Sequence, residues 1–325
     1  MIINIYLSSN SITNKSKSGP AFLQYSVIEA IKQTQHIVTV HILDEKYGRA
    51  CNTDRKVPLK VNPDITQWIH CCDLVIENMT TGKYFILSLA DLFCGDQLDN
   101  LDRPELENVF MGQYIPEVVD MLGKKYSYKI KPWTYVPSST VDREKFYNYR
   151  RFLSTNINYN LIKNKLFWLG TNGSRPIIHH IDPNLLTNTV YPLQQEDYYQ
   201  LLVKHRVALA VGGASYSDMC YRDIEYLQLG VPYIKFEYKN TMNPPLIPNY
   251  HYISIPVPDD LPIHNSVMSD RLGLPHHAEL IKQRFNEVIN DIEFLDYISI
   301  NARQYYLDNL TLDKQLQRTL QLLDL

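Results

Sequence analysis

One stretch of the chain, residues 207–236, has the pattern of a complete strand–turn–helix–strand unit. Residues 207–211 (VALAV) form a short, wholly apolar run, which is typical of a strand buried on both faces of a parallel sheet. Gly212 and Gly213 follow it and allow the backbone to turn freely. A second apolar run, residues 231–236, predicts the next parallel strand. This order of elements strongly favours an α/β fold.

The helix between these strands can be capped by Ser217 or Asp218, and Gly230 predicts its end. Its N-terminus would lie at the carboxyl edge of the sheet, where free N–H groups attract anions. Arg222 and Glu225 are three residues apart and share one helix face. A guanidinium suits a diphosphate and a carboxylate suits ribose hydroxyls, so the pair suits a nucleoside diphosphate. The alternative is that the two side chains pair with each other on a solvated face.

This segment resembles the donor-binding helix of the GT-B glycosyltransferases, in which a glutamate holds the nucleotide ribose and a Gly-x-Pro follows. Glu225 and Gly230-Val231-Pro232 match that pattern here. The Arg-x-x-Glu spacing is similar to that of the bacteriophage DNA β-glucosyltransferases. The common Glu-x7-Glu form is absent, because Asp218 stands one residue too close. The resemblance implies an α/β chain of two Rossmann-like domains facing across a cleft.

Length and composition are consistent with this class. A chain of 325 residues suggests about two domains, and a formal net charge of −3 argues against a general nucleic-acid binder. The five cysteines are odd in number and form no Cys-x-x-Cys, which predicts reduced thiols, a cytoplasmic protein and no zinc site. The N-terminus is expected to be a strand rather than a signal peptide, and no apolar run approaches the ~18 residues of a membrane span.

In the first half, Asp91 is the candidate catalytic residue. It follows the predicted strand 84–89, at the edge where open parallel sheets bind ligands. Its role would be that of a general base toward an acceptor hydroxyl, with Asp96 and Asp99 as substitutes; the alternative is a turn-capping aspartate. The other elements expected in this half are strands at 2–7, 36–43, 73–77 and 124–131 and helices at 21–34, 65–72 and 109–122, the last interrupted near Pro116.

Two basic, aromatic stretches, 124–131 and 143–151, invite a second hypothesis. They could hold a phosphate-bearing acceptor, although a solvated linker face is the preferred interpretation. The proline-bearing stretch 132–140 is expected to lead into the linker between domains.

The second half opens with a predicted strand, 165–169, followed by a glycine-rich turn. Such a turn between a strand and a helix can cradle a diphosphate. The resemblance implies the same role for this loop, with Arg175 reaching the phosphates. The remaining elements expected are helices at 196–205, 278–296, 299–308 and 312–325 and a strand at 251–257. The residues predicted to bind the donor are Gly170, Gly173, Ser174, Arg175, Gly212, Gly213, Arg222 and Glu225.

The predicted domains are 1–155 (acceptor), 156–300 (nucleotide-sugar donor) and 301–325 (closing helices). The closing helices resemble those of GT-B and exostosin-like transferases, in which the last helix crosses back to the first domain. The sequence contains no Asp-x-Asp, the motif that holds a metal on the diphosphate in another transferase class.

We therefore expect a metal-independent hexosyltransferase without a cofactor. It would move a sugar from a nucleotide-sugar, with uridine as the commonest nucleotide, to a hydroxyl acceptor. With Asp91 as the base, the configuration would invert. The acceptor stays open among a glycan, a small molecule, a protein side chain and a modified nucleic-acid base. The alternatives are a nucleotide-sugar epimerase of the same fold and a non-catalytic binding protein.

Overall fold

The computed structural model separates the chain into two compact units. The first comprises Met1–Thr140, Asn240–Asn243 and Leu312–Leu325, and the second comprises Val141–Lys239 and Pro244–Thr311. The structure describes residues 1–8, 20–43, 57–58, 68–69, 73–88, 101–112, 114–133, 143–155, 161–169, 176–187, 193–212, 219–239, 242, 244–258 and 274–325.

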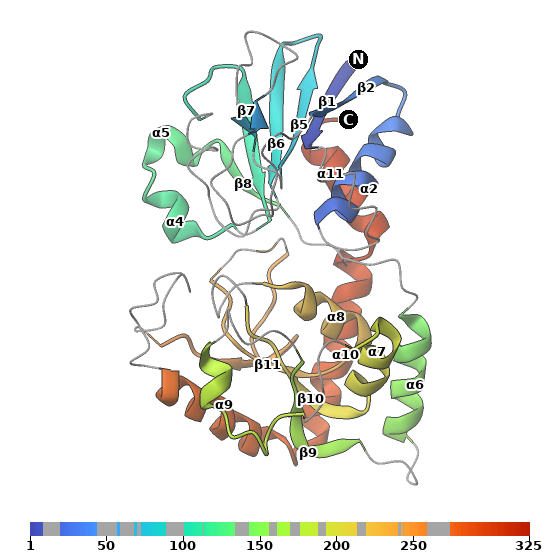
Figure 1. The fold of residues 1–325 in the computed structure, drawn as a ribbon, viewed down its shortest axis with the longest axis vertical. Coiled ribbons are helices and arrows are strands. Elements are labelled where there is room, and N and C mark those ends of the chain that lie inside the picture. Colours follow the sequence, from blue (N-terminus) through green and yellow to red (C-terminus); the bar gives the residue numbers. More distant parts are fainter. Residues whose placement is uncertain are drawn as a thin grey trace. The chain divides into compact units, whose positions relative to one another are not determined.

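The first unit is built on a six-stranded sheet (Figure 1). Its strand order is β2-β1-β5-β6-β7-β8, and β1–β2, β6–β7 and β7–β8 pair in parallel. The bounds are β1 Ile2–Ser8, β2 Ile37–Leu43, β5 Asp73–Asn78, β6 Lys83–Ser88, β7 Leu106–Met111 and β8 Ile130–Pro132. Two further short strands, β3 (Val57–Pro58) and β4 (Trp68–Ile69), pair with each other.

One strand, β5, runs antiparallel to both neighbours, so this sheet is mixed. The turn after it explains the direction. The Asn78 carbonyl accepts from the Gly82 N–H at 2.8 Å, and Gly82 has a positive φ of 67°. A turn this short returns the chain beside the strand it has just left, whereas a parallel connection needs a crossover of a dozen or more residues.

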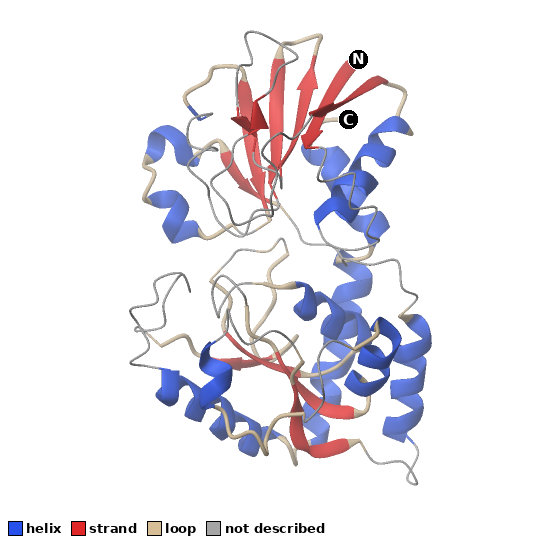
Figure 2. Cartoon of the chain, viewed as in Figure 1, coloured by secondary structure: helices blue, strands red, loops and turns tan. Residues whose placement is uncertain are grey.

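Helices cover both faces of this sheet (Figure 2). On one face α2 (Pro20–Lys32) and α11 (Leu312–Leu322) pack together with the apolar residues of β1 and β5. The Trp133 indole N–H donates to Thr319 Oγ1 of α11 at 3.0 Å. The prediction that the final helix crosses back to the first part of the chain is therefore confirmed.

The opposite face is covered by α4 (Pro116–Asp120) and α5 (Lys124–Ser127). Two predictions are wrong here: 124–131 is not one strand, and 109–122 is not one helix. Strand β7 runs to Met111, and α4 begins with its proline at the first helical position, where the missing N–H costs nothing.

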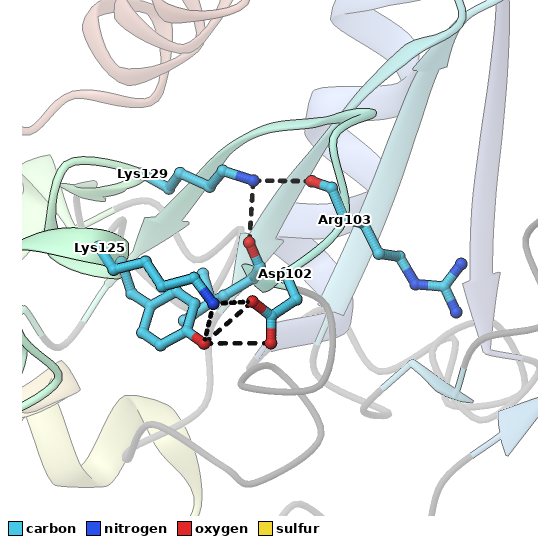
Figure 3. A network of polar contacts seen from close by, with 6 residues as sticks. Asp102, Arg103, Lys125 and Lys129 are labelled. Carbon is cyan, nitrogen blue, oxygen red and sulfur yellow. Dashed lines mark hydrogen bonds and ion pairs between the residues drawn. The ribbon is translucent and has the colours of Figure 1, made fainter.

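Polar contacts hold α5 to the loop before β7 (Figure 3). Lys125 binds the Asp102 carboxylate, and the buried Lys129 ammonium donates to the carbonyls of Leu101 and Arg103 at 2.9 and 2.7 Å. Burial lowers the pKa of Lys129. The basic character of 124–131 therefore serves partly to fix this loop.

The second unit contains a four-stranded, fully parallel sheet in the order β12-β11-β10-β9. Its bounds are β9 Ile162–Phe167, β10 His205–Leu209, β11 Tyr233–Phe236 and β12 Ile253–Ile255. Residues alternate between the faces of β11. Ile234 and Phe236 join the core beneath α9 (Leu274–Val288), while Lys235 bonds to α8 (Tyr221–Leu229). The predicted strand–helix–strand unit is confirmed.

Helix α8 ends where the sequence predicts, but it begins later. Gly230 adopts the left-handed conformation at φ 59°, as a helix-ending glycine does. The N-cap is Cys220 rather than Ser217 or Asp218, which lie outside the described residues. The Cys220 backbone N–H donates to Asp223 Oδ2 at 2.6 Å, so Asp223 closes a capping box.

The other described helices of this unit are α6, α7, α9 and α10, together with the 3-10 turn η1. Helix α8 packs against α6 and α10 on one face of the sheet, and α9 packs against the 3-10 turn on the other. The predicted helix 278–296 is in fact two helices, because Asp291 caps α10 by accepting from the Phe294 N–H at 3.0 Å. The bounds are α6 Glu144–Thr155, η1 Pro176–His180, α7 Gln195–Leu202 and α10 Ile292–Asn309.

One histidine of this unit predicts a dependence of stability on pH. His251 Nδ1 accepts from the Ile247 N–H at 2.9 Å, and burial lowers the pKa of His251 from 6.5 to about 4. As the pH falls, His251 therefore becomes protonated in the unfolded chain before it does so in the folded protein. Its stabilising contribution is complete above about pH 6.5 and declines as the pH falls toward 4, with a slope of up to ~1.4 kcal/mol per pH unit.

We expect His251→Gln to remove that slope. Urea unfolding of both proteins between pH 7 and 4.5 should show the stability difference between wild type and variant shrinking as the pH falls. A difference that stays constant over this range would contradict the assignment.

Candidate functional site

Three of the predicted donor-site residues lie in the described part of the second unit. Gly212 is buried and follows β10 closely, and Arg222 and Glu225 lie on α8. The other predicted donor-site residues fall outside the described residues: Gly170, Gly173, Ser174, Arg175 and Gly213. So does Asp91, the candidate catalytic base of the first half.

Arg222 is fixed at the end of β9. Its Nε donates to the Leu169 carbonyl at 3.1 Å, and its guanidinium carbon lies 5.1 Å from the centre of the Trp168 ring. This cation–π contact and the hydrogen bond set the plane of the guanidinium. Among the described residues no acceptor bonds to its Nη atoms. The arginine is therefore oriented by its own chain, and within the described residues its Nη donors have no acceptor.

Glu225 is nearly buried, with 9% of the residue exposed, and it has three partners. Its Oε1 accepts from the Tyr199 hydroxyl at 2.7 Å and lies 3.4 Å from Arg143 Nη2. Its Oε2 accepts from the Tyr198 hydroxyl at 3.3 Å. Arg222 and Glu225 thus bond to different groups, rather than forming the simple surface pair that was the alternative.

Sequence reasoning missed Arg143, which is 1% exposed and precedes α6. Its Nη1 donates to Gln228 Oε1 at 3.0 Å and its Nη2 to the Tyr199 hydroxyl at 2.6 Å. The interpretation of 143–151 as a solvated face is wrong for Arg143 and Arg150, which are both buried, and right for Arg151, which is exposed. Only the charge of these residues is visible in the sequence, whereas their partners are 50 or more residues away.

The tyrosines from α7 act as hydrogen-bond donors to the carboxylate. Burial raises the pKa of Tyr199, and the neighbouring Glu225 charge raises it further. Burial also raises the pKa of Tyr198. Both hydroxyls therefore stay protonated at neutral pH and can donate to Glu225.

Below this site lies an ion pair that is fully buried. Lys235 Nζ of β11 is 3.3 Å from Asp223 Oδ2 of α8, and both side chains are 0% exposed. The ammonium also lies 5.0 Å from the centre of the Tyr238 ring. Burial raises the pKa of Asp223. Because Asp223 also caps α8, the pair fixes the start of this helix on the sheet.

A separate hollow of about 320 Å³ opens beside Glu237, which follows β11. Arg284 on its wall is satisfied by the Ser254 carbonyl, Asn249 and Glu287. Neither Arg222 nor Glu225 lines it. The described residues that line it are Glu237, Asn249, Ser254, Ile255, Pro256, Leu280, Gln283, Arg284 and Glu287.

Within the residues that the structure describes, no three His, Cys, Asp or Glu side chains gather into a set that could hold a metal ion. Likewise, no described helix combines the length and the hydropathy needed to cross a bilayer.

Comparison with known proteins finds similarity only among solved structures. No family model matches the chain, and no curated protein matches it. The chain is similar to a glycosyltransferase from Rickettsia africae at 11% identity and a TM-score of 0.40, over 66% of this chain and 62% of that one. It is similar to HepE from Anabaena in complex with UDP-glucose at 12% identity and a TM-score of 0.41, over 69% and 65%.

A third similar structure is sucrose-phosphate synthase from Thermosynechococcus elongatus, at 11% identity and a TM-score of 0.44, over 99% of this chain and 98% of that one. The match spans less than two thirds of the length of the Rickettsia and Anabaena structures. The α/β class with two sheets and a returning C-terminal helix, which the sequence predicts, is established by the chain's own strands and helices.

Proposed function

We propose that this chain is a GT-B glycosyltransferase that moves a sugar from a nucleotide-sugar, with UDP-sugars the first candidates, to a hydroxyl acceptor. The observation that carries the proposal is the arrangement on α8. Arg222 and Glu225 lie on the helix that follows the carboxyl edge of a parallel sheet. Each is oriented by its own chain, and among the described residues the Arg222 Nη atoms have no acceptor and Glu225 Oε2 has a single donor. An edge of this kind is where α/β sheets bind nucleotides.

The proposed roles follow from the chemistry of each group. The guanidinium groups of Arg175 and Arg222 neutralise the departing diphosphate, and Glu225 accepts hydrogen bonds from the ribose. Backbone N–H groups around Gly170, Gly173, Ser174, Gly212 and Gly213 contact the phosphates.

In the transfer step the acceptor oxygen forms a bond to the anomeric carbon. Asp91 removes the hydroxyl proton, and the diphosphate leaves with the electron pair of the broken C–O bond. Attack from the opposite face inverts the configuration. Because the two arginines stabilise the leaving group, an obligatory metal ion is not part of this proposal.

We also propose a cytoplasmic location, on the grounds of an odd cysteine number and the free thiol of Cys220. The acceptor remains open among the classes named above.

The first test is nucleotide binding measured by thermal shift and calorimetry. UDP, GDP and their sugar conjugates should be screened, because a ligand that binds only the folded state raises Tm. Arg222→Ala and Glu225→Ala should each lower the affinity at least ~10-fold, since each removes a charge-assisted hydrogen bond worth about 1.5–3 kcal/mol. The matched control is Glu279→Ala on α9, whose side chain is 63% exposed and should leave the affinity unchanged.

Wild-type affinity in both α8 variants would refute the donor site. Asp91→Asn should lower turnover without changing donor affinity, and near-normal turnover would remove Asp91 from the mechanism. Incubation with the donor alone checks the reaction class, since a new free nucleotide-sugar would identify an epimerase instead.

A further inference from the structure

We propose that Arg143 and Tyr199 are positioning residues, which hold one oxygen of Glu225 so that the other oxygen is presented to the ribose. This inference rests on the proposed function and adds two residues to its site. It predicts that these residues control the selection of ribonucleotides over 2′-deoxyribonucleotides.

The carboxylate of Glu225 is bonded asymmetrically. Oε1 has two partners, the Tyr199 hydroxyl at 2.7 Å and Arg143 Nη2 at 3.4 Å. Oε2 has one described partner, the Tyr198 hydroxyl at 3.3 Å, which is longer than an ordinary O–H···O bond. A carboxylate oxygen can accept about two hydrogen bonds. Within the described residues Oε1 therefore has both of its donors, whereas Oε2 has one weak donor and capacity for another.

The groups that hold Oε1 are themselves fixed. The Arg143 side chain is 1% exposed, and its second nitrogen donates to Gln228. Tyr199 is fully buried and its ring packs against Phe146 of α6 at a centroid distance of 5.4 Å. The Glu225 side chain, by contrast, keeps 12% of its surface exposed. Among Arg143, Tyr199 and Glu225, the Glu225 carboxylate is therefore the group that solvent or a ligand can reach.

Arg143 is attached to the rest of the unit through α6. Glu144 bonds to Arg303 of α10, and Arg150 donates to carbonyls at the ends of α7 and α8. These contacts fix the start of α6, so the guanidinium position is set before a ligand binds. A rigid second layer of this kind lowers the entropy cost of binding.

A buried carboxylate that only accepts hydrogen bonds selects ligands that donate them. In the proposed site Oε2 accepts from the ribose 2′-hydroxyl. A 2′-deoxyribose lacks this hydroxyl and keeps only the 3′-hydroxyl, so Oε2 loses its donor. Sites built to bond a hydroxyl reject analogues that lack it, because the buried polar group is then left without a partner. Without the hydrogen bonds from Tyr199 and Arg143 to Oε1, the Glu225 carboxylate can rotate. This change lowers the preference for ribonucleotides over 2′-deoxyribonucleotides and leaves the other contacts with the nucleotide in place.

The experiment measures Kd by calorimetry for UDP against 2′-deoxy-UDP and for GDP against 2′-deoxy-GDP. Wild type should prefer the ribonucleotide of its pair at least ~10-fold. Tyr199→Phe and Arg143→Gln should each reduce that preference to about threefold or less, with the affinity for the deoxynucleotide unchanged, which also shows that the variants are folded. Tyr305→Phe is the matched control, since it removes a buried hydroxyl that donates to the Pro244 carbonyl elsewhere, and it should keep the full preference.

The outcomes separate this inference from the proposed function. If Glu225→Gln loses the preference while Tyr199→Phe and Arg143→Gln keep it, the positioning role is wrong and the donor site stands. If Glu225→Gln itself keeps the preference, Glu225 does not bind the ribose and the inference fails. If wild type binds neither nucleotide pair, the proposed function fails together with the inference.

Discussion

Lys235→Met is expected to lower the free energy of unfolding by about 3–5 kcal/mol, which is the typical cost of removing one partner from a buried ion pair. Methionine fills most of the lysine volume, so the loss comes from electrostatics rather than from a cavity. The Asp223 carboxyl would stay at 0% exposure without its cationic partner, and among the described residues Cys220 would be left to bond to it. Denaturant unfolding followed by circular dichroism measures the change.

The double variant Lys235→Met with Asp223→Asn provides the control. The amide removes the stranded charge and keeps an oxygen that can accept from the Cys220 N–H, so the helix cap survives. We expect the double variant to recover at least half of the stability lost in the single one. Additive losses across this double-mutant cycle would show that the two side chains do not interact.

Arg150→Met is the second substitution with a large expected effect, again about 3–5 kcal/mol of unfolding free energy. The guanidinium is buried and donates to the carbonyls of Gly230 at 3.1 Å, Val203 at 3.2 Å, His205 at 2.7 Å and Arg206 at 3.4 Å. Burial lowers the pKa of Arg150 to about 10, so it remains charged at neutral pH. No carboxylate bonds to it within the described chain. Carbonyls at the ends of α7 and α8 balance its charge instead.

The adjacent residue supplies a matched control for this experiment. Arg151 lies on the same helix but is exposed, so Arg151→Met should change the unfolding free energy by no more than about 0.5 kcal/mol. Arg150→Lys should recover only part of the loss, because one ammonium cannot reach carbonyls spread over several residues. Equal stabilities for the two methionine variants would contradict the structural role of Arg150.

The elements that the sequence predicted correctly are those whose signal is local. Apolar runs bounded by glycine placed β10 and β11, and Gly230 marked the end of α8. The wrong predictions concern segments whose secondary structure depends on contacts with residues far away in the sequence. The alternation over 124–131 predicts one strand, yet Lys125 bonds to Asp102 and the first four of these residues form the helix α5.

The candidate site shows the same limit. Glu225 could be selected by its spacing from Arg222, because both lie on one short helix. Arg143 could not be selected from the sequence, because its charge predicts a solvated side chain and its partners come from α7 and α8. A buried arginine is recognised only when the acceptors that satisfy it are known.

The return of α11 to the first unit has a consequence for how the protein is made. Synthesis from the N-terminus releases the strands of the first sheet long before Leu312–Leu322 leaves the ribosome. Until then Trp133 lacks the Thr319 hydroxyl, and the apolar surface that Leu323 covers is open to water. The nascent first half must therefore remain incomplete, and within reach of chaperones, until α11 has been synthesised.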